Sequence, residues 1–263
     1  MDTAVIRISG ALLCLGLSWR VLTDWDPKPF GDRSQQVAVS ALMKQAEKFN
    51  DEQQYAKAVK ATEALYLTDP ANYIYAGLLA TAKQGLHEYQ AAAGLWEEYL
   101  RNAPVPGEAC PQIGLAYRDA GQTAKALDAL QRCLAFEPKN PDILYALGAT
   151  YMETDSRAEA ESAFRKGLSL AADDADLSLG LGRLALRRGK AGEAAGVAAA
   201  VLKRQSENSD ALLLAGMAAT DQGRLADARR FLEHAARVTS RDTDIRAALA
   251  RVQAREGREG KAK

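Results

Sequence analysis

The chain has 263 residues and a balanced charge, with 34 Lys and Arg against 34 Asp and Glu, which argues against binding to nucleic acid through bulk charge. It contains 52 alanines but only 8 prolines and 6% aromatic residues, a composition typical of an all-helical protein. Three cysteines are too few for a disulfide-rich scaffold or a zinc ribbon, and two distant histidines, His87 and His234, leave little for catalysis. The composition therefore favours a helical protein that is not an enzyme.

The first 22 residues are mostly apolar, with Arg7 and Arg20 as the only basic residues among them. The longest stretch free of those charges covers 12 residues, fewer than the roughly 20 of a straight membrane-spanning helix. Both arginines and Trp19 suit the two interfaces of a bilayer, so a span is feasible. We expect residues 1–22 to be an uncleaved membrane anchor. A cleaved signal peptide and an extra helix on the domain remain the alternatives.

Residues 23–38 read as a linker between this segment and the rest of the chain. Basic residues are more frequent on the carboxyl side of the apolar segment, which favours a cytoplasmic domain. Against this, an N-terminal anchor ahead of a soluble domain commonly exports that domain. We therefore expect the periplasmic or exported side, with the cytoplasmic side as the alternative.

A period of 34 residues organises the chain from residue 39 onward. Pro70, Pro104 and Pro138 follow that spacing, and polar breaks continue it. Two columns of small residues share the period. The first comprises Ala58, Ala92, Ala126, Ala160, Ala194 and Ala228. The second comprises Ala46, Ala80, Gly114, Gly148, Gly182, Gly216 and, in a seventh frame, Ala250. Two such columns predict two helices per repeat that cross closely at the small residues.

Large residues accompany the alanines of the first column at helical spacing. Trp96, Leu130, Phe164 and Leu232 lie four residues after an alanine and therefore on the same helix face. The fifth repeat departs from this pattern, because Ser178, Ala185 and Ala198 stand where large residues are usual. We expect this repeat to pack thinly.

The period, the small-residue columns and the closing prolines resemble the tetratricopeptide repeat (TPR). Residues 114–138 and 148–170 match its pattern best, with Leu147, Gly148 and Tyr151 at signature positions of the first helix and Ala160 and Phe164 at those of the second. The signature tryptophan of the first helix is absent throughout.

The resemblance implies an all-α, right-handed superhelical solenoid of six helix-turn-helix repeats plus a C-terminal capping helix. The repeats would be 39–72, 73–106, 107–140, 141–174, 175–208 and 209–242. Residues 243–263 would form the capping helix and a tail.

In TPR proteins the first helices line a concave groove that binds a partner peptide or helix. The resemblance places in this groove Met43, Glu47, Thr81, Leu115, Arg118, Tyr145, Met152, Arg183, Leu186, Arg187, Leu213 and Met217. The Lys/Asn/Arg set with which some TPR proteins hold a terminal carboxylate is missing from the corresponding slots. An apolar stripe flanked by arginines suits a segment with one apolar side and some acidic residues. Ordinary packing between repeats is the alternative role for several of these positions.

Cys110 and Cys133 fall on the two antiparallel helices of the third repeat, at levels that should face each other. They are either two small buried apolar residues or a disulfide, which would require an oxidising compartment. Cα atoms much more than 7 Å apart would exclude the disulfide.

Residues 183–263 hold 17 basic and 10 acidic residues, a net charge of +7. These charges are spread around the helices, so they form either a solvated face or a docking surface for an anionic lipid or an acidic partner.

Since no catalytic, metal-binding or phosphate-binding motif is present, we expect no cofactor, metal or small-molecule substrate. We expect a non-catalytic scaffold for protein–protein interaction, acting as an assembly or biogenesis factor for a bacterial cell-envelope complex. The alternative is a regulatory or accessory subunit that recruits an acidic partner, a lipid or a nucleic acid through its basic C-terminal end.

Overall fold

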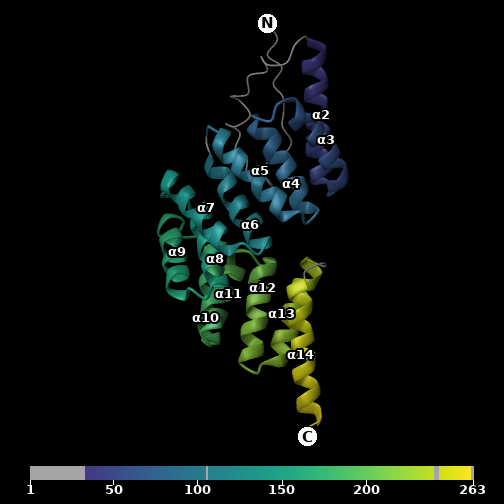
Figure 1. Cartoon of the computed structure of the whole chain (residues 1–263). Coiled ribbons are helices and arrows are strands. Elements are labelled where there is room, and N and C mark those ends of the chain that lie inside the picture. The colour runs from purple at the N-terminus through teal and green to yellow at the C-terminus, as the bar shows by residue number, and fades with distance from the viewer. Residues whose placement is uncertain (1–32, 105, 240–242, 262–263) are drawn as a thin grey trace. The chain divides into compact units, whose positions relative to one another are not determined.

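The computed structural model describes residues 33–104, 106–239 and 243–261, and these residues form helices and their connections without any strand (Figure 1). The chain divides into two compact units, Met1–Ala146 and Leu147–Lys263. The division falls within helix α8 (Pro141–Glu153), and each unit is described by itself. The predicted anchor, residues 1–22, lies outside the described residues. None of the helices in the described ranges has the length and apolar character needed to cross a bilayer.

Unit 1 contains three pairs of helices. They are α2 (Arg33–Asp51) with α3 (Tyr55–Thr68), α4 (Tyr73–Gly85) with α5 (Tyr89–Asn102), and α6 (Cys110–Asp119) with α7 (Thr123–Phe136). The second helix of one pair also packs against the first helix of the next, α3 on α4 and α5 on α6. Helix α2 begins at Arg33, so part of the predicted linker 23–38 is helical.

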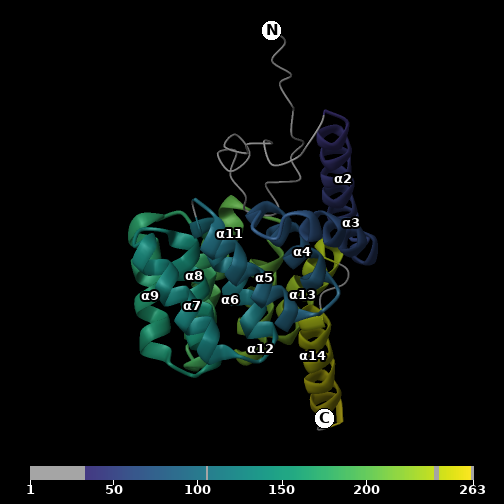
Figure 2. The same cartoon turned by 45° about the horizontal axis from the view of Figure 1, so that its top comes forward.

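Unit 2 continues the same alternation of first and second helices. Its helices after α8 are α9 (Arg157–Leu170), α10 (Ala175–Arg187), α11 (Ala191–Arg204), α12 (Ser209–Asp221), α13 (Leu225–Val238) and α14 (Thr243–Lys261). Figure 2 shows α13 beside α14, and both α12 and α13 contact α14. The predicted capping helix thus covers the last pair of helices.

The small-residue columns lie where paired helices cross. All six alanines of the second-helix column are fully buried. On the first helices, a Cβ added at Gly148 would lie 2.5 Å from the ring of Phe164, and one added at Gly216 would lie 2.5 Å from Leu232. Because no methyl group fits at these distances, the close approach that the sequence predicted depends on these glycines.

The fifth repeat fills the corresponding space differently. Ala198 stands where the second, third, fourth and sixth repeats have a large residue, and it is not among the nearest neighbours of Gly182. Instead Leu214, from the first helix of the next repeat, lies 2.5 Å from where a Cβ of Gly182 would be, and Val197 lies 3.1 Å from it. A side chain from the neighbouring repeat therefore supplies the missing volume, and the thin packing that we expected does not leave an open gap at Gly182.

Helix α14 departs from the pattern of the other first helices. Ala250, the seventh member of the column, is exposed, whereas Ile245, Ala248 and Val252 are buried. In the repeats the column faces the second helix of the same pair, and within the described residues no helix follows α14. Its buried face consequently points only toward the preceding helices.

The turn inside every repeat uses a left-handed backbone at the same frame position. Residues 53, 87, 121, 155, 189 and 223 all have φ between 56° and 74°. Glycine occupies three of these positions, and Gln53, His87 and Asp155 occupy the others. A side chain in this conformation costs energy, so the fold imposes the turn even where the sequence does not favour it.

Asparagine or aspartate begins four first helices at the same spacing. Side chains of Asn72, Asn140, Asp174 and Asn208 each accept a hydrogen bond from a backbone N–H of the first turn. The third repeat has Pro106 at this frame position, which offers no side-chain acceptor. There the chain forms a 3-10 turn, Pro106–Ala109, before α6 begins at Cys110.

Candidate functional site

Three of the residues predicted to line a binding groove belong instead to the core. Met43, Met152 and Leu213 are 7–8% exposed. Met43, for example, packs in a cluster with Leu65 and Tyr75. Leu213 packs in a cluster with Leu225 and Leu232 of α13. Burial of such apolar side chains between helices is favourable. The three side chains offer little surface to a partner.

In unit 1 the predicted residues that reach the surface lie on α2, α4, α6 and the start of α8. Leu115 is 36% exposed and Arg118, on the same helix, is half-buried. Thr81 donates its hydroxyl hydrogen to the carbonyl of Gly77 at 3.0 Å, so this donor is used within its own helix. Tyr145 is half-buried. Leu115 is therefore the predicted apolar residue most open to a partner in this unit.

Glu47, on α2, is a half-buried carboxylate within this surface. Burial raises the pKa of Glu47, and the nearby carboxylate of Asp51 raises this pKa further.

In unit 2 the predicted arginines tie first helices to one another. Arg183 on α10 pairs with Asp210 on α12 at 2.7 Å, and Arg187 donates to the carbonyl oxygen of Met152 on α8. Leu186 packs partly against the core cluster of α10, α11 and α12. These contacts hold the first helices in one layer, which is the packing role that we left open for several of these positions.

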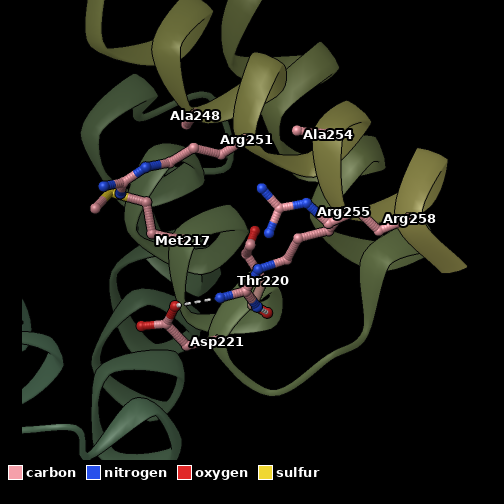
Figure 3. Close-up of a pocket in the computed structure, with 8 residues that line it drawn as sticks. All are labelled: Met217, Thr220, Asp221, Ala248, Arg251, Ala254, Arg255 and Arg258. Carbon is pink, nitrogen blue, oxygen red and sulfur yellow. Dashed lines mark hydrogen bonds and ion pairs between the residues drawn. The ribbon is translucent and has the colours of Figure 1, made fainter.

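A basic pocket lies between α12 and α14, in the C-terminal region whose basic residues the sequence offered as an alternative docking surface. Met217, the last predicted groove residue, lines it, together with Thr220, Asp221, Ala248, Arg251, Ala254, Arg255 and Arg258 (Figure 3). Arg255 donates to the carbonyl oxygen of Thr220 at 2.5 Å. Arg187 bonds to Met152 with the same separation of 35 residues. In both cases an arginine follows a residue near the end of a first helix by 35 residues, about one repeat. This spacing is the sequence signal that could have located the pocket.

The second helices carry ion pairs between neighbouring repeats. Arg132 on α7 binds Glu97 on α5 at 2.7 Å, and Tyr117 donates to the same carboxylate at 3.4 Å. The hydrogen bond to Glu97 is the main cause of the raised pKa of Arg132, whereas burial is the main cause of the raised pKa of Tyr117. Since Glu97 is held by two partners, this cluster links helices and provides no free acid or base.

Cys110 and Cys133 form a disulfide between α6 and α7. Their Cα atoms are 5.8 Å apart and both side chains are about 1% exposed. The distance lies inside the range that a disulfide requires.

The remaining titratable residues that the sequence singled out lie apart or pair with other side chains. No cluster of three His, Cys, Asp or Glu that could hold a metal ion occurs within the described ranges. His87 sits in the turn of the second repeat, and His234 is half-buried on α13. Asp173 and Glu98, which could have served as acids, contact Arg204 and Tyr66.

Three segments match descriptions of the tetratricopeptide repeat. Residues 114–155 match the family described as TPR repeat, and residues 141–174 and 179–242 match families described as tetratricopeptide repeat. These matches support the TPR assignment that the 34-residue period predicted. No curated protein matches the sequence.

Solved structures show the same fold at low sequence identity. A chain of the APC/C hetero-tetramer Cut9-Hcn1 has a TM-score of 0.65 and 14% identity over 81% of this chain and 42% of its own. PilW, described as a widely conserved type IV pilus biogenesis factor, has a TM-score of 0.64 and 17% identity over 83% of this chain and 100% of its own. PilF of Pseudomonas aeruginosa has a TM-score of 0.60 and 15% identity over 83% and 99%. The all-helical TPR solenoid fold is thereby established, and it is typical of non-catalytic scaffolds for protein–protein interaction.

Proposed function

We propose that this protein is an assembly or biogenesis factor for a cell-envelope complex and binds a segment of a partner protein on the face of its first helices. The observation that carries the proposal is the surface around Leu115, where an apolar side chain is 36% exposed beside Arg118 on the first helix α6. Such a surface suits an amphipathic helix or an extended segment with an apolar side.

Two further observations support a role in the envelope. The Cys110–Cys133 disulfide requires an oxidising compartment to form and persist, which is the property of a bacterial periplasm. The fold is also that of PilW, whose description is that of a pilus biogenesis factor. We propose that the TPR repeats act on the exported side of the membrane and that residues 1–22 anchor them there.

The test is affinity purification from cells with the full chain as bait, in which Leu115→Asp is compared with the unchanged protein. An acidic side chain at the centre of an apolar contact is expected to reduce recovery of the partner by about tenfold or more. The matched control is Phe136→Asp, because Phe136 is 73% exposed but belongs to the second helix α7. Equal recovery with Leu115→Asp and the unchanged protein, or an equal loss with both variants, would refute binding on the first-helix face.

The exported location has its own measurement. The thiols of Cys110 and Cys133 should resist an alkylating reagent in cell extracts quenched with acid and become reactive only after reduction. Free thiols in freshly quenched cells would place the protein in a reducing compartment.

A further inference from the structure

We infer that the pocket between α12 and α14 binds a carboxylate-bearing, acidic segment of a partner protein. We name this site the α14 pocket; its lining residues are those labelled in Figure 3. The inference rests on the proposed scaffold function and specifies the chemistry of one part of the partner.

Three arginines of the α14 pocket share one face of α14. Arg251, Arg255 and Arg258 follow one another at intervals of four and three residues, so their side chains project from the same side of the helix. The pocket that they line has a volume of about 330 Å³. Such a volume accommodates a few side chains of a bound segment.

Two of these arginines have unused hydrogen-bond donors. Arg255 is committed to α12, because it donates to the carbonyl of Thr220 and lies 4.0 Å from the carboxylate of Asp221. Within the described residues, Arg251 and Arg258 have neither an ion-pair partner nor a hydrogen-bond acceptor. A guanidinium presents donors that match a carboxylate in a bidentate arrangement, so both side chains are prepared to receive one.

The composition of the α14 pocket favours a carboxylate over a phosphate. Met217, Ala248 and Ala254 provide an apolar wall, and in Figure 3 the side chain of Arg251 extends toward Met217. An apolar side chain next to an acidic one can pack on this wall, which a sugar-phosphate backbone cannot exploit.

Ion pairs around the pocket reduce the positive field outside it, so an acidic partner is attracted mainly to the pocket itself. On the adjacent helix α13, Arg229 pairs with Glu256, and both Arg224 and Arg230 pair with Asp227. A membrane surface or a nucleic acid is attracted by a broad field of uncompensated charge. Here the pairing of Arg224, Arg229 and Arg230 with acids reduces the field around the pocket, whereas Arg251 and Arg258 are unpaired within the described residues.

The experiment measures fluorescence polarisation of a labelled, end-blocked peptide that repeats Leu-Glu-Glu, with the full chain and with a variant carrying Arg251→Gln and Arg258→Gln. Loss of two charge-assisted contacts is expected to weaken binding about tenfold. The control carries Arg237→Gln and Arg246→Gln, two exposed arginines outside the pocket, and should bind within about twofold of the unchanged protein because exposed charges at a distance are screened.

Further measurements define what overturns the inference. The same peptide with Gln in place of Glu should not compete, and circular dichroism should show equal helicity in both double variants. Preferential binding of vesicles containing anionic lipid, or of a single-stranded oligonucleotide, would replace the acidic peptide with that partner. Equal weakening in both double variants, or no binding of the peptide, would also overturn it. Leu115→Asp should leave peptide binding unchanged, so a failure of the α14 pocket is distinguishable from a failure of the proposed function.

Discussion

Cys110 and Cys133 join the first and second helices of the third repeat through a disulfide whose Cα atoms are 5.8 Å apart. The first helix of this repeat, α6, spans 10 residues and is the shortest of the six first helices described. It also lacks the Asn or Asp cap that begins other first helices. The covalent link therefore occurs in the repeat whose first helix is shortest and begins without a side-chain cap. We interpret the disulfide as a compensation for the delayed start of α6.

The first prediction concerns the loss of this link. Replacing both cysteines by alanine should lower the free energy of unfolding by about 3 kcal/mol, because a bridge between residues 23 positions apart no longer restricts the unfolded chain. Urea unfolding followed by circular dichroism measures the change. A reducing agent should produce a similar loss in the unchanged protein and none in the double variant. Coincident unfolding curves for the two proteins would contradict the prediction.

A second prediction concerns the left-handed turn of the first repeat. Gln53 has φ 56°, whereas its neighbour Gln54 has φ −87°. Gln53→Gly should raise the free energy of unfolding by up to about 1 kcal/mol, since glycine adopts a positive φ without steric cost. Gln54→Gly, the matched control, should lower it, because there the substitution adds unfolded-state entropy and removes the side-chain hydrogen bonds with Glu52 and Lys57. Thermal unfolding of both variants checks the sign, and an equal shift in both would show that the turn conformation is not responsible.

The sequence predicted the repeats but not the role of every residue within them. The 34-residue period and the small side chains were sufficient to predict that Gly148 lies against the second helix of its repeat. Two helices cross closely only where side chains are small, and the sequence of each repeat shows where these small residues are. The direction of a side chain around a helix is less certain, so Met43 and Met152 were predicted at a surface and lie in the core. The basic C-terminal end was considered as a docking surface, but the α14 pocket within it was not located, because the register of α14 differs from that of the repeats, as the exposed Ala250 shows.

A third prediction uses the pKa of a buried phenol. Tyr75 is fully buried, and its hydroxyl has no hydrogen-bond partner among the described residues. Burial, with a smaller effect of Asp69, raises its pKa to about 12. The unfolded chain ionises first, near pH 10, so the folded protein should lose stability as the pH rises from about 10 to 12.

The variant Tyr75→Phe isolates this effect. At pH 7 it should be at least as stable as the unchanged protein, because it removes an unsatisfied hydroxyl worth about 1 kcal/mol, and above pH 10 it should lose less stability. Urea unfolding at pH 7 and pH 11 provides the comparison. Tyr66→Phe serves as a contrast, because Tyr66 donates to Glu98 and its removal should cost stability at pH 7. A marked destabilisation by Tyr75→Phe at pH 7 would show that its hydroxyl has a partner after all.

The last prediction tests how the fifth repeat replaces its missing side chain. Leu214 is 1% exposed and fills the space beside Gly182, so Leu214→Ala should cost about 3 kcal/mol. Ala198→Leu alone should cost about 1–3 kcal/mol by overpacking, because a leucine at that frame position would reach the same space that Leu232 occupies beside Gly216.

The double variant Leu214→Ala with Ala198→Leu tests whether Leu214 replaces the side chain that is absent at position 198. If Leu214 replaces the side chain absent at position 198, the new leucine should occupy the cavity left by Leu214→Ala. The combined loss in free energy of unfolding should then be smaller than the sum of the single losses by about 1 kcal/mol or more. Additive losses in urea unfolding would mean that the two positions do not share a space, and that the fifth repeat is held by contacts elsewhere in α10 and α11.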